Sequence, residues 1–465
     1  MKKLLTLALL LSMAAGVFAQ EKEKEIVKTG LNFGPLPAIG YSSDYGWHYG
    51  ALLNIFNYGD GSVYPDYRWL LKTEASWYSK GNSVYHLYYD SKYLIPGIRV
   101  AAAVSYFGNK TSAFYGFNGA PSLYVPTLDK ITSAGQGFYL MRRDIFRVVT
   151  GFQGQIGDSH WSWAAGLNFY SIKTGHAENK GLKGYDKKAK KPAEDYSLYD
   201  MYIDYGIIPE AEAKGGRHLE GLVGLVFDTR DHENNPTRGT NLEVMFYGSP
   251  DIVNGRSGAD WRNHYLKAAV HFKQFFPLVK DRLVFGGHLA YQGTIAGHTP
   301  YYMLQTIQFI NMKQNLNEGL GSTSTLRGTV FNRLQGEGYA WGNFELRWNF
   351  VRFKLFKQNF ILALNPFFDL GAVVQPYRLE EMKRLSDQDA DYYLYPAPVA
   401  IDDDGQGYWP HQFYTGNKEK LHMSAGSGLH IIMNQNFNIN FEVGKCFDKN
   451  DGSGLGINVG LNYIF

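Results

Sequence analysis

The chain ends in the ten residues Gly456-Ile-Asn-Val-Gly-Leu-Asn-Tyr-Ile-Phe465, and this stretch decides the fold. Its large apolar side chains alternate with asparagine and glycine, so one face of an extended strand is apolar and the other is polar. The apolar set is Ile457, Val459, Leu461, Tyr463 and Phe465. A final strand of this kind, with aromatic residues at its end, is typical of outer-membrane barrels. We therefore expect Tyr463 and Phe465 to form a C-terminal outer-membrane signal.

The other end of the chain has the pattern of an export signal. Two lysines precede an apolar stretch, and Val17 and Ala19 occupy the small-residue positions of a cleavage site. We expect a signal peptide over residues 1–19, a short periplasmic segment over residues 20–32 and a barrel over residues 33–465. The middle segment is too short to fold as a separate periplasmic domain.

The composition agrees with strands that face lipid on one side and a polar lumen on the other. A mean hydropathy of -0.29 would suit a soluble protein, but alternation in a barrel gives a similar average. Aromatic residues make up 16% of the chain, and such rings gather at membrane interfaces. A single cysteine, Cys446, excludes an internal disulfide. The net charge of +3 gives no reason to expect a nucleic-acid partner.

Alternation recurs along the whole chain. In one segment Phe344, Leu346 and Trp348 share one face, while Glu345 and Arg347 share the other. A soluble β-sandwich would show the same period, so periodicity alone leaves both folds open. We expect about sixteen strands, beginning near residues 35, 46, 66, 82, 96, 136, 159, 218, 239, 262, 281, 338, 358, 419, 437 and 455.

The lengths of the connections favour the barrel. The long ones span residues 108–135, 174–217, 294–337 and 373–417, and each follows an odd-numbered strand. Outer-membrane barrels place short turns on the periplasmic side and long loops outside, whereas a sandwich has no reason to sort its loops in this way. We therefore predict an all-β fold, an antiparallel 16-stranded transmembrane barrel with long extracellular loops.

Three motifs go beyond this alternation. Leu-Arg-Gly, residues 326–328, lies at the centre of the third long connection, and Asn-Pro-Phe-Phe-Asp-Leu-Gly, residues 365–371, lies in the thirteenth strand. Phe-Asp-Thr-Arg-Asp, residues 227–231, lies between the eighth and ninth strands. Asp228 and Asp231 in this last motif could hold calcium, but the Asn and Pro that follow favour a tight periplasmic turn.

Together with residues 343–347 (Asn-Phe-Glu-Leu-Arg) and the terminal Phe465, these motifs resemble the bacterial surface antigen superfamily, the BamA/TamA-like outer-membrane barrels. The resemblance covers the chain from about residue 33 to its end. It implies the outer membrane of a Gram-negative bacterium as the location. Members that assemble or translocate proteins usually carry periplasmic POTRA domains before the barrel, and we expect this chain to lack them.

The resemblance also implies a site. The third long connection corresponds to the sixth outer loop of the family, which folds into the lumen. Arg327 would then reach the barrel wall and pair with Asp369 and Glu345, and Gly328 would allow a tight turn beside the pair. From the residues alone, Arg327 could equally be a loop cation in water. The site residues implied are Leu326, Arg327, Gly328, Glu345, Asp369 and Gly371.

The function implied is assistance to the insertion or translocation of polypeptides at the outer membrane. The implied partners are outer-membrane lipid, client outer-membrane polypeptides and an accessory periplasmic or lipoprotein subunit, and we expect a monomeric barrel. Pro35 and Pro37 suit a first strand that pairs weakly with the last, because proline removes a ladder donor. The alternatives are a passive or gated pore, since the lumen is polar, and a surface-exposed binding or scaffold protein with long loops.

The sequence shows no catalytic constellation. Neither Gly-x-Ser-x-Gly nor His-Glu-x-x-His occurs. His271, His422 and His430 fall in the lumen phase, where we expect them to be polar lining rather than metal ligands. We therefore expect no enzymatic activity, no metal and no cofactor.

Overall fold

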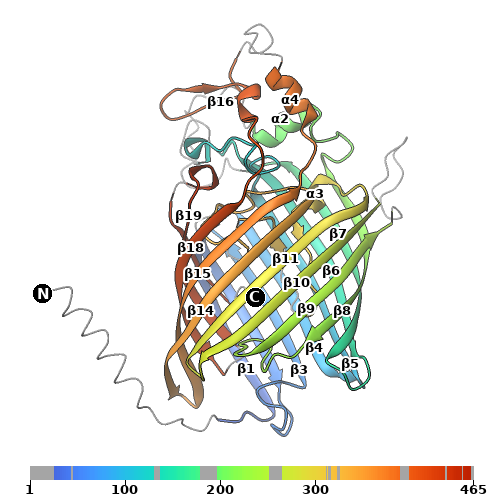
Figure 1. Cartoon of the computed structure of the whole chain (residues 1–465), viewed down its shortest axis with the longest axis vertical. Coiled ribbons are helices and arrows are strands. Elements are labelled where there is room, and N and C mark those ends of the chain that lie inside the picture. The colour runs from blue at the N-terminus through green and yellow to red at the C-terminus, as the bar shows by residue number, and fades with distance from the viewer. Residues whose placement is uncertain are drawn as a thin grey trace, which may run out of the picture.

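The computed structural model of the chain describes residues 26–42, 45–129, 137–178, 196–250, 264–310, 312, 316–321, 325–387, 397–434, 437–452 and 454–461. Sixteen antiparallel strands in these ranges close into one barrel, each pairing with its neighbours in chain order (Figure 1). They are β1 (Leu31–Ser42), β2 (Gly46–Asn57), β3 (Trp69–Tyr78), β4 (Asn82–Ile95), β5 (Ile98–Ala113), β6 (Leu140–Gln155), β7 (Trp161–His176), β8 (Gly215–Asp228), β9 (Gly239–Ser249), β10 (Tyr265–Val279), β11 (Leu283–Gly297), β14 (Gly338–Leu355), β15 (Gln358–Gln375), β18 (His422–Met433), β19 (Phe437–Cys446) and β20 (Gly456–Leu461).

The predicted fold class is confirmed, and each expected strand start lies within four residues of the observed one. β10 continues through Pro277 to Val279. The ladder with β11 is irregular between these two residues, so the missing N–H of proline falls where pairing is already interrupted. The expected signal peptide, and Tyr463 and Phe465 at the other end, lie outside the described residues.

The wall has an apolar outer face and a polar inner face. Val223 of β8 is 60% exposed and Leu289 of β11 is 49% exposed, whereas Glu220 and His288 on the opposite face of the same strands are buried. Large apolar side chains exposed over many strands suit lipid rather than water. The alternation seen in the sequence is therefore a division between lipid and lumen.

The four long connections begin and end at the same end of the barrel, the upper end in Figure 1, as their parity predicted. The connecting segments contain the short elements η1 (Pro126–Asp129), α2 (Leu198–Asp204), α3 (Tyr301–Leu304), β12 (Thr306–Ile307), β13 (Asn317–Glu318), α4 (Glu380–Asp387), β16 (Ala400–Ile401), β17 (Gly407–Tyr408), η2 (Pro410–Phe413) and η3 (Lys449–Asp451). Across the described ranges, no helix combines the length and the apolar character needed to cross a membrane.

Three of these connections pack over the outer mouth of the barrel. We call their described residues, 114–129, 137–139, 196–214, 376–387 and 397–421, the outer cap. Its centre is aromatic: the ring of Phe117 lies 4.0 Å from that of Tyr377 and 5.6 Å from that of Tyr202, measured between centroids. The largest apolar core of the described residues thus lies where loops pack on the inner face of one wall, and not between two sheets.

The fourth connection, residues 298–337 between β11 and β14, folds into the lumen, and we call it the plug loop. Leu320, Leu326 and Leu334 of this loop are fully buried against Trp341 of β14 and Val373 of β15. The inward folding expected of the sixth outer loop is therefore confirmed.

Candidate functional site

The tip of the plug loop, residues 325–331, rests on the last two strands. Gly328 has a φ of +89°, and a Cβ there would lie 2.4 Å from Gly444 C of β19. In turn, a Cβ on Gly456 of β20 would lie 2.8 Å from Gly328 Cα. Three glycines therefore allow backbone to pack directly on backbone, and any side chain at Gly328 would separate the tip from the wall.

These last strands border the junction of β1 with β20, which we call the seam. β1 pairs with β2 along its whole length, from Leu31 with Asn57 to Ser42 with Gly46. Within the described residues, which end at Leu461, β1 pairs with β20 only at Ser42 with Asn458. The described parts of the first and last strands thus share far fewer ladder pairs than other neighbouring strands do.

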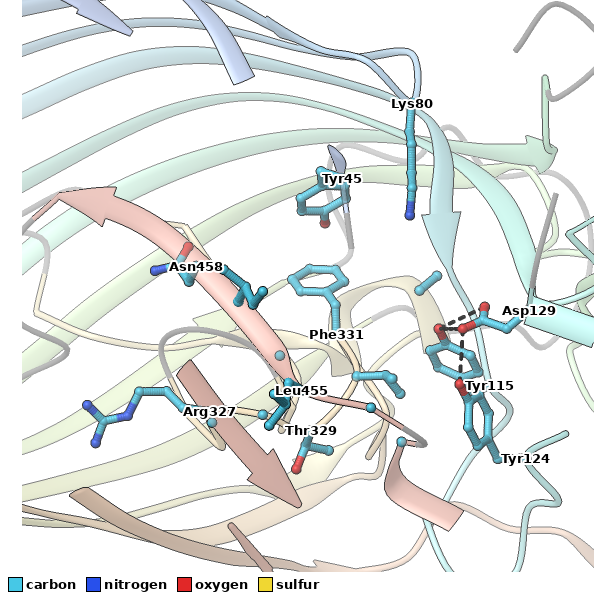
Figure 2. A pocket seen from close by; sticks show the side chains of 18 of the residues that line it. Tyr45, Lys80, Tyr115, Tyr124, Asp129, Arg327, Thr329, Phe331, Leu455 and Asn458 are labelled. Carbon is cyan, nitrogen blue, oxygen red and sulfur yellow. Dashed lines mark hydrogen bonds between the residues drawn. The ribbon is translucent and has the colours of Figure 1, made fainter. Parts of the chain in front are cut away.

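A cavity of about 240 Å³ lies between the plug-loop tip and the seam (Figure 2). Phe331 of the tip lines it, together with Tyr45, which follows β1, and Asn458 of β20. The far wall carries Asp129, whose carboxylate accepts hydrogen bonds from the hydroxyls of two tyrosines of the outer cap, Tyr115 and Tyr124. Burial raises the pKa of Asp129 even though these hydrogen bonds act in the opposite direction.

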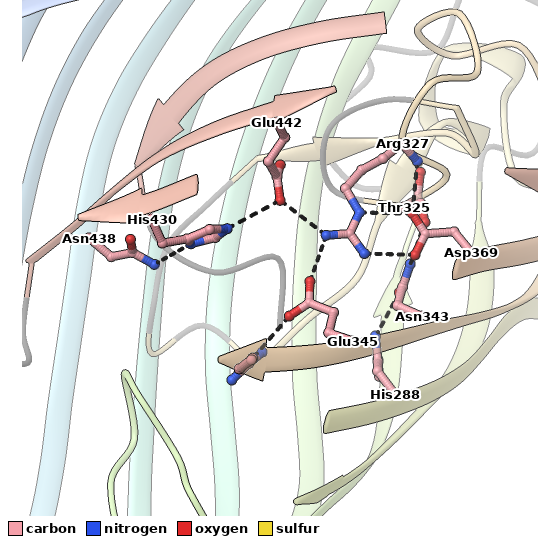
Figure 3. A network of polar contacts seen from close by, with 10 residues as sticks. His288, Thr325, Arg327, Asn343, Glu345, Asp369, His430, Asn438 and Glu442 are labelled. Atoms are coloured by element: carbon pink, nitrogen blue, oxygen red, sulfur yellow. Dashed lines mark hydrogen bonds and ion pairs between the residues drawn. The ribbon is translucent and has the colours of Figure 1, made fainter. Parts of the chain in front are cut away.

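Arg327 of the tip reaches three wall strands at once (Figure 3). Its Nε and Nη2 atoms donate to the two carboxylate oxygens of Asp369 in β15, each over 2.8 Å. Its Nη1 atom donates to Glu345 Oε1 of β14 over 2.6 Å and to Glu442 Oε1 of β19 over 3.1 Å. All three nitrogen atoms of the guanidinium therefore donate to wall carboxylates. We call these four side chains the charge network.

All four members of the charge network are at least 96% buried. Burial works against the charge of Arg327, but Asp369 and Glu345 outweigh it and raise the pKa of the guanidinium above its ordinary value. Arg347 adds a second cation, because its Nε donates to Glu345 Oε2 over 2.9 Å. The ring of Phe367 lies 3.6 Å from the guanidinium carbon of Arg327 and adds a cation–π contact.

A second anchor holds the plug loop to the opposite wall. Arg143 of β6 pairs with Glu318 of β13 and also donates to the carbonyl of Tyr302 over 2.9 Å. Lys267 of β10 donates to the carbonyl of Met303 over 3.0 Å. The plug loop therefore spans the lumen between two sets of buried charges.

The structure brings Arg327, Asp369 and Glu345 together, as the resemblance implied, and the reading of Arg327 as a cation in water is wrong. Gly371 plays a different part, since a Cβ there would lie 3.1 Å from Leu320 Cδ1 of the plug loop. Glu442 was missed, although its lumen phase between Phe441 and Val443 was visible. The partnership of Arg143 with Glu318 left no local signal in the sequence.

The remaining candidate ligands have partners inside the protein. Asp231 accepts the backbone N–H of Thr237 over 2.8 Å within the turn between β8 and β9, and Asp228 pairs with Arg230. His422 lies between Asp451 and Glu419, at 2.6 and 3.0 Å. His271 Nε2 lies 2.8 Å from Gln308 O of the plug loop, and His430 Nδ1 lies 3.1 Å from Asn438 Nδ2. In the described part of the chain, no group of three His, Cys, Asp or Glu residues could hold a metal ion.

Comparison with known proteins supplies the family. No curated protein matches the chain. Among solved structures, it is similar to BamA from Haemophilus ducreyi lacking POTRA domains 1–3, at 15% identity and a TM-score of 0.49, over 94% of this chain and 70% of that one. It is also similar to CdiB from Acinetobacter baumannii, at 12% identity and a TM-score of 0.43, over 94% and 60% of the two chains. A bacterial polysaccharide outer membrane secretin aligns at 8% identity and a TM-score of 0.37, over 94% and 98%.

The sequence itself gives the decisive match. Residues 74–465 fit the model of the Omp85 superfamily domain, which covers most of the chain. The resemblance drawn from the motifs is thereby confirmed. The chain belongs to the Omp85 superfamily and is a barrel of the Gram-negative outer membrane.

Proposed function

We propose that this barrel assists the insertion or translocation of polypeptides at the outer membrane by opening at the seam. The observation that carries the proposal is the single ladder pair, Ser42 with Asn458, between the described parts of β1 and β20. Between the described parts of these strands, a single ladder pair has to break before they separate.

When β1 and β20 separate in lipid, the backbone groups along their edges lose their partners and can pair with a new strand. Unpaired backbone groups cost several kcal/mol each in hydrocarbon, so exposed strand edges favour an extended segment that can pair with them. Pro35 and Pro37 remove two donors from β1 and lower the number of bonds that closure can form. A client polypeptide in an extended conformation is the partner that this edge fits.

The charge network supports opening at this place rather than elsewhere. Arg327 binds side chains of β14, β15 and β19, which all lie on the β20 side of the seam. These strands and the plug loop can therefore stay together as β1 moves away. The lipid-facing wall remains closed on both sides of the opening.

A disulfide staple across the seam tests the proposal. Ser42→Cys with Asn458→Cys, in a Cys446→Ser background, joins residues that are directly paired. Leu36→Cys with Leu52→Cys is the matched control, because it staples β1 to β2, which are already fully paired. In cells depleted of the native protein, the oxidised seam staple should fail to restore the outer-membrane proteome, and reduction should rescue it.

The control staple should restore the outer-membrane proteome in either redox state. The proposal fails if depletion leaves outer-membrane and surface proteins unchanged, or if the oxidised seam staple complements fully. An accessory periplasmic or lipoprotein subunit would deliver the clients, and co-purification from gently solubilised membranes would identify it.

A pore is the second candidate function. Both polar atoms of the side chains of Asn241 and Asn365 are buried without a protein hydrogen bond, so they suit a lumen that contains water. A surface-exposed binding or scaffold role is the third. It predicts that deletion of the β16–β17 hairpin abolishes one specific interaction and leaves the outer-membrane proteome intact.

A further inference from the structure

The N-terminal segment, residues 26–30, makes a contact on the periplasmic rim that the charge network does not involve. The backbone N–H of Ile26 donates to Asn359 Oδ1 over 3.1 Å, and Asn359 Nδ2 donates back to the carbonyl of Ile26 over 3.2 Å. Lys28 Nζ also donates to the carbonyl of Lys357 in the turn between β14 and β15. The side-chain amide of Asn359 thus pairs with the segment as a neighbouring strand would.

The segment is fixed to the β1 side of the seam. Gly30 donates to the carbonyl of Gly59 over 2.7 Å, and Tyr58 donates to the carbonyl of Gly30 over 2.9 Å, which extends the β1–β2 ladder by one residue. A Cβ on Gly61, in the following turn, would lie 2.8 Å from Thr29 and 3.0 Å from the carbonyl of Lys28. The segment therefore has to move when β1 moves.

Asn359 is fixed to the opposite side. It lies in β15, and its backbone N–H donates to Asn434 Oδ1 over 3.0 Å at the end of β18. Asn434 Nδ2 in turn donates to Gln358 Oε1 over 2.6 Å. On the side of β1 to β3, the hydroxyl of Tyr64 also accepts from Asn359 Nδ2, over 3.4 Å. The contact between Ile26 and Asn359 therefore joins strands that the seam separates.

We propose that residues 26–30 and Asn359 form a periplasmic latch that bridges the two sides of the seam and holds it closed until the segment is released. The inference rests on the proposed opening of the seam, and it adds a contact that determines when the seam can open. The amide of Asn359 contacts only backbone atoms of residue 26, so the latch does not depend on the side chain at that position. An extended segment of another polypeptide can offer the same two backbone groups and take its place.

Distances across the seam test the latch in the purified full-length chain in lipid nanodiscs. Spin labels on Ile39→Cys of β1 and Leu429→Cys of β18, in a Cys446→Ser background, report the width of the seam from the lipid face. Labels on Leu225→Cys of β8 and Leu289→Cys of β11 are equally three strands apart within the closed wall and serve as the reference pair.

Two variants release the latch by different routes. Asn359→Ala removes the amide, and Ile26→Pro removes the N–H donor of residue 26 without changing any residue of the barrel wall. Both should give a longer and broader distance distribution across the seam and an unchanged one at the reference pair. Ile26→Ala keeps the donor, and Gln155→Ala removes a rim amide that binds Ser159 in the remote β6–β7 turn, so neither should change the seam distance.

The latch is overturned if Ile26→Pro and Asn359→Ala both reproduce the parent distribution, or if Ile26→Ala and Gln155→Ala widen the seam as much as they do. The result is separable from the fate of the proposed function. If the seam widens when the latch is released, but cells with the oxidised seam staple assemble a normal outer membrane, the latch is supported and the proposed function is wrong. If the latch variants leave the seam distance unchanged while the oxidised seam staple still blocks complementation, the latch is wrong and the proposed function stands.

Discussion

At the scale of single residues, Arg327 balances the three carboxylates that the wall turns toward the plug loop. Arg327→Met leaves Asp369, Glu345 and Glu442 buried without their shared cation, which should lower the free energy of unfolding by about 3–5 kcal/mol. Arg327→Lys should rescue only part of this loss, because an ammonium cannot form the two-pronged contact with Asp369. The measurement is urea unfolding in detergent micelles, in which the gel mobility of the folded barrel reports the fraction of protein that is still folded.

The matched control for this prediction is Arg352→Met at the periplasmic end of β14, where the side chain is exposed and donates to the carbonyl of Asp281. This change should alter stability by no more than about 0.5 kcal/mol. Equal unfolding midpoints for Arg327→Met and Arg352→Met would show that the charge network is not a stabilising element.

Gly328 gives a second prediction at this scale. Gly328→Ala places a Cβ 2.4 Å from the backbone of β19, so the plug-loop tip should lift from the wall and expose Arg327. Gly405→Ala is the control, because its φ of +81° imposes a similar backbone strain while no atom lies within 4 Å of the added carbon. Trypsin should cleave after Arg327 in the first variant and not in the second. Protection of that bond in Gly328→Ala would contradict the packing described above.

At the scale of elements, Arg333 joins three segments of the outer surface. Its guanidinium is fully buried and donates to the carbonyls of Gly119 and Ser122 in the outer cap, and to that of Asn450 in η3, over 2.7 to 3.0 Å. Arg333→Met should leave these carbonyls without their donor, at a cost of roughly 1–3 kcal/mol.

Hydrogen exchange checks this prediction, since residues 117–125 and 447–452 should lose protection together in Arg333→Met. Arg378→Met, which removes an exposed arginine from the same outer surface, should leave their exchange unchanged. Unchanged protection in both variants would mean that the outer cap and η3 are held by other contacts.

The elements also show how far the sequence could be read. Alternation assigns each side chain to the lipid or the lumen, which is why strands and the inward face of Asp369 were predictable. Alternation does not give the height of a residue in the barrel, because height depends on the stagger of all strands on closure. Glu442 could therefore be assigned to the lumen but not to Arg327, and Glu318 could not be matched to Arg143.

At the scale of the whole molecule, we expect the plug loop to limit what the lumen conducts, because it spans the lumen between two sets of buried charges. The purified protein in a planar bilayer should show rare, brief openings, because buried contacts from both sides of the lumen hold the plug loop in place. Replacing residues 299–336 with a short glycine-serine linker should give a steady, large conductance. Removing residues 401–407 from the β16–β17 hairpin is the control and should leave the record unchanged. Steady conductance of the unaltered protein would favour the pore.

The stack of Gly328, Gly444 and Gly456 has a consequence for the history of each molecule. β19 and β20 follow the plug loop in the chain, and their backbone packs on the tip of that loop. The final hairpin therefore needs a finished template to settle on. We therefore expect folding to follow a fixed order, in which the plug loop enters the lumen before β19 and β20 close the barrel.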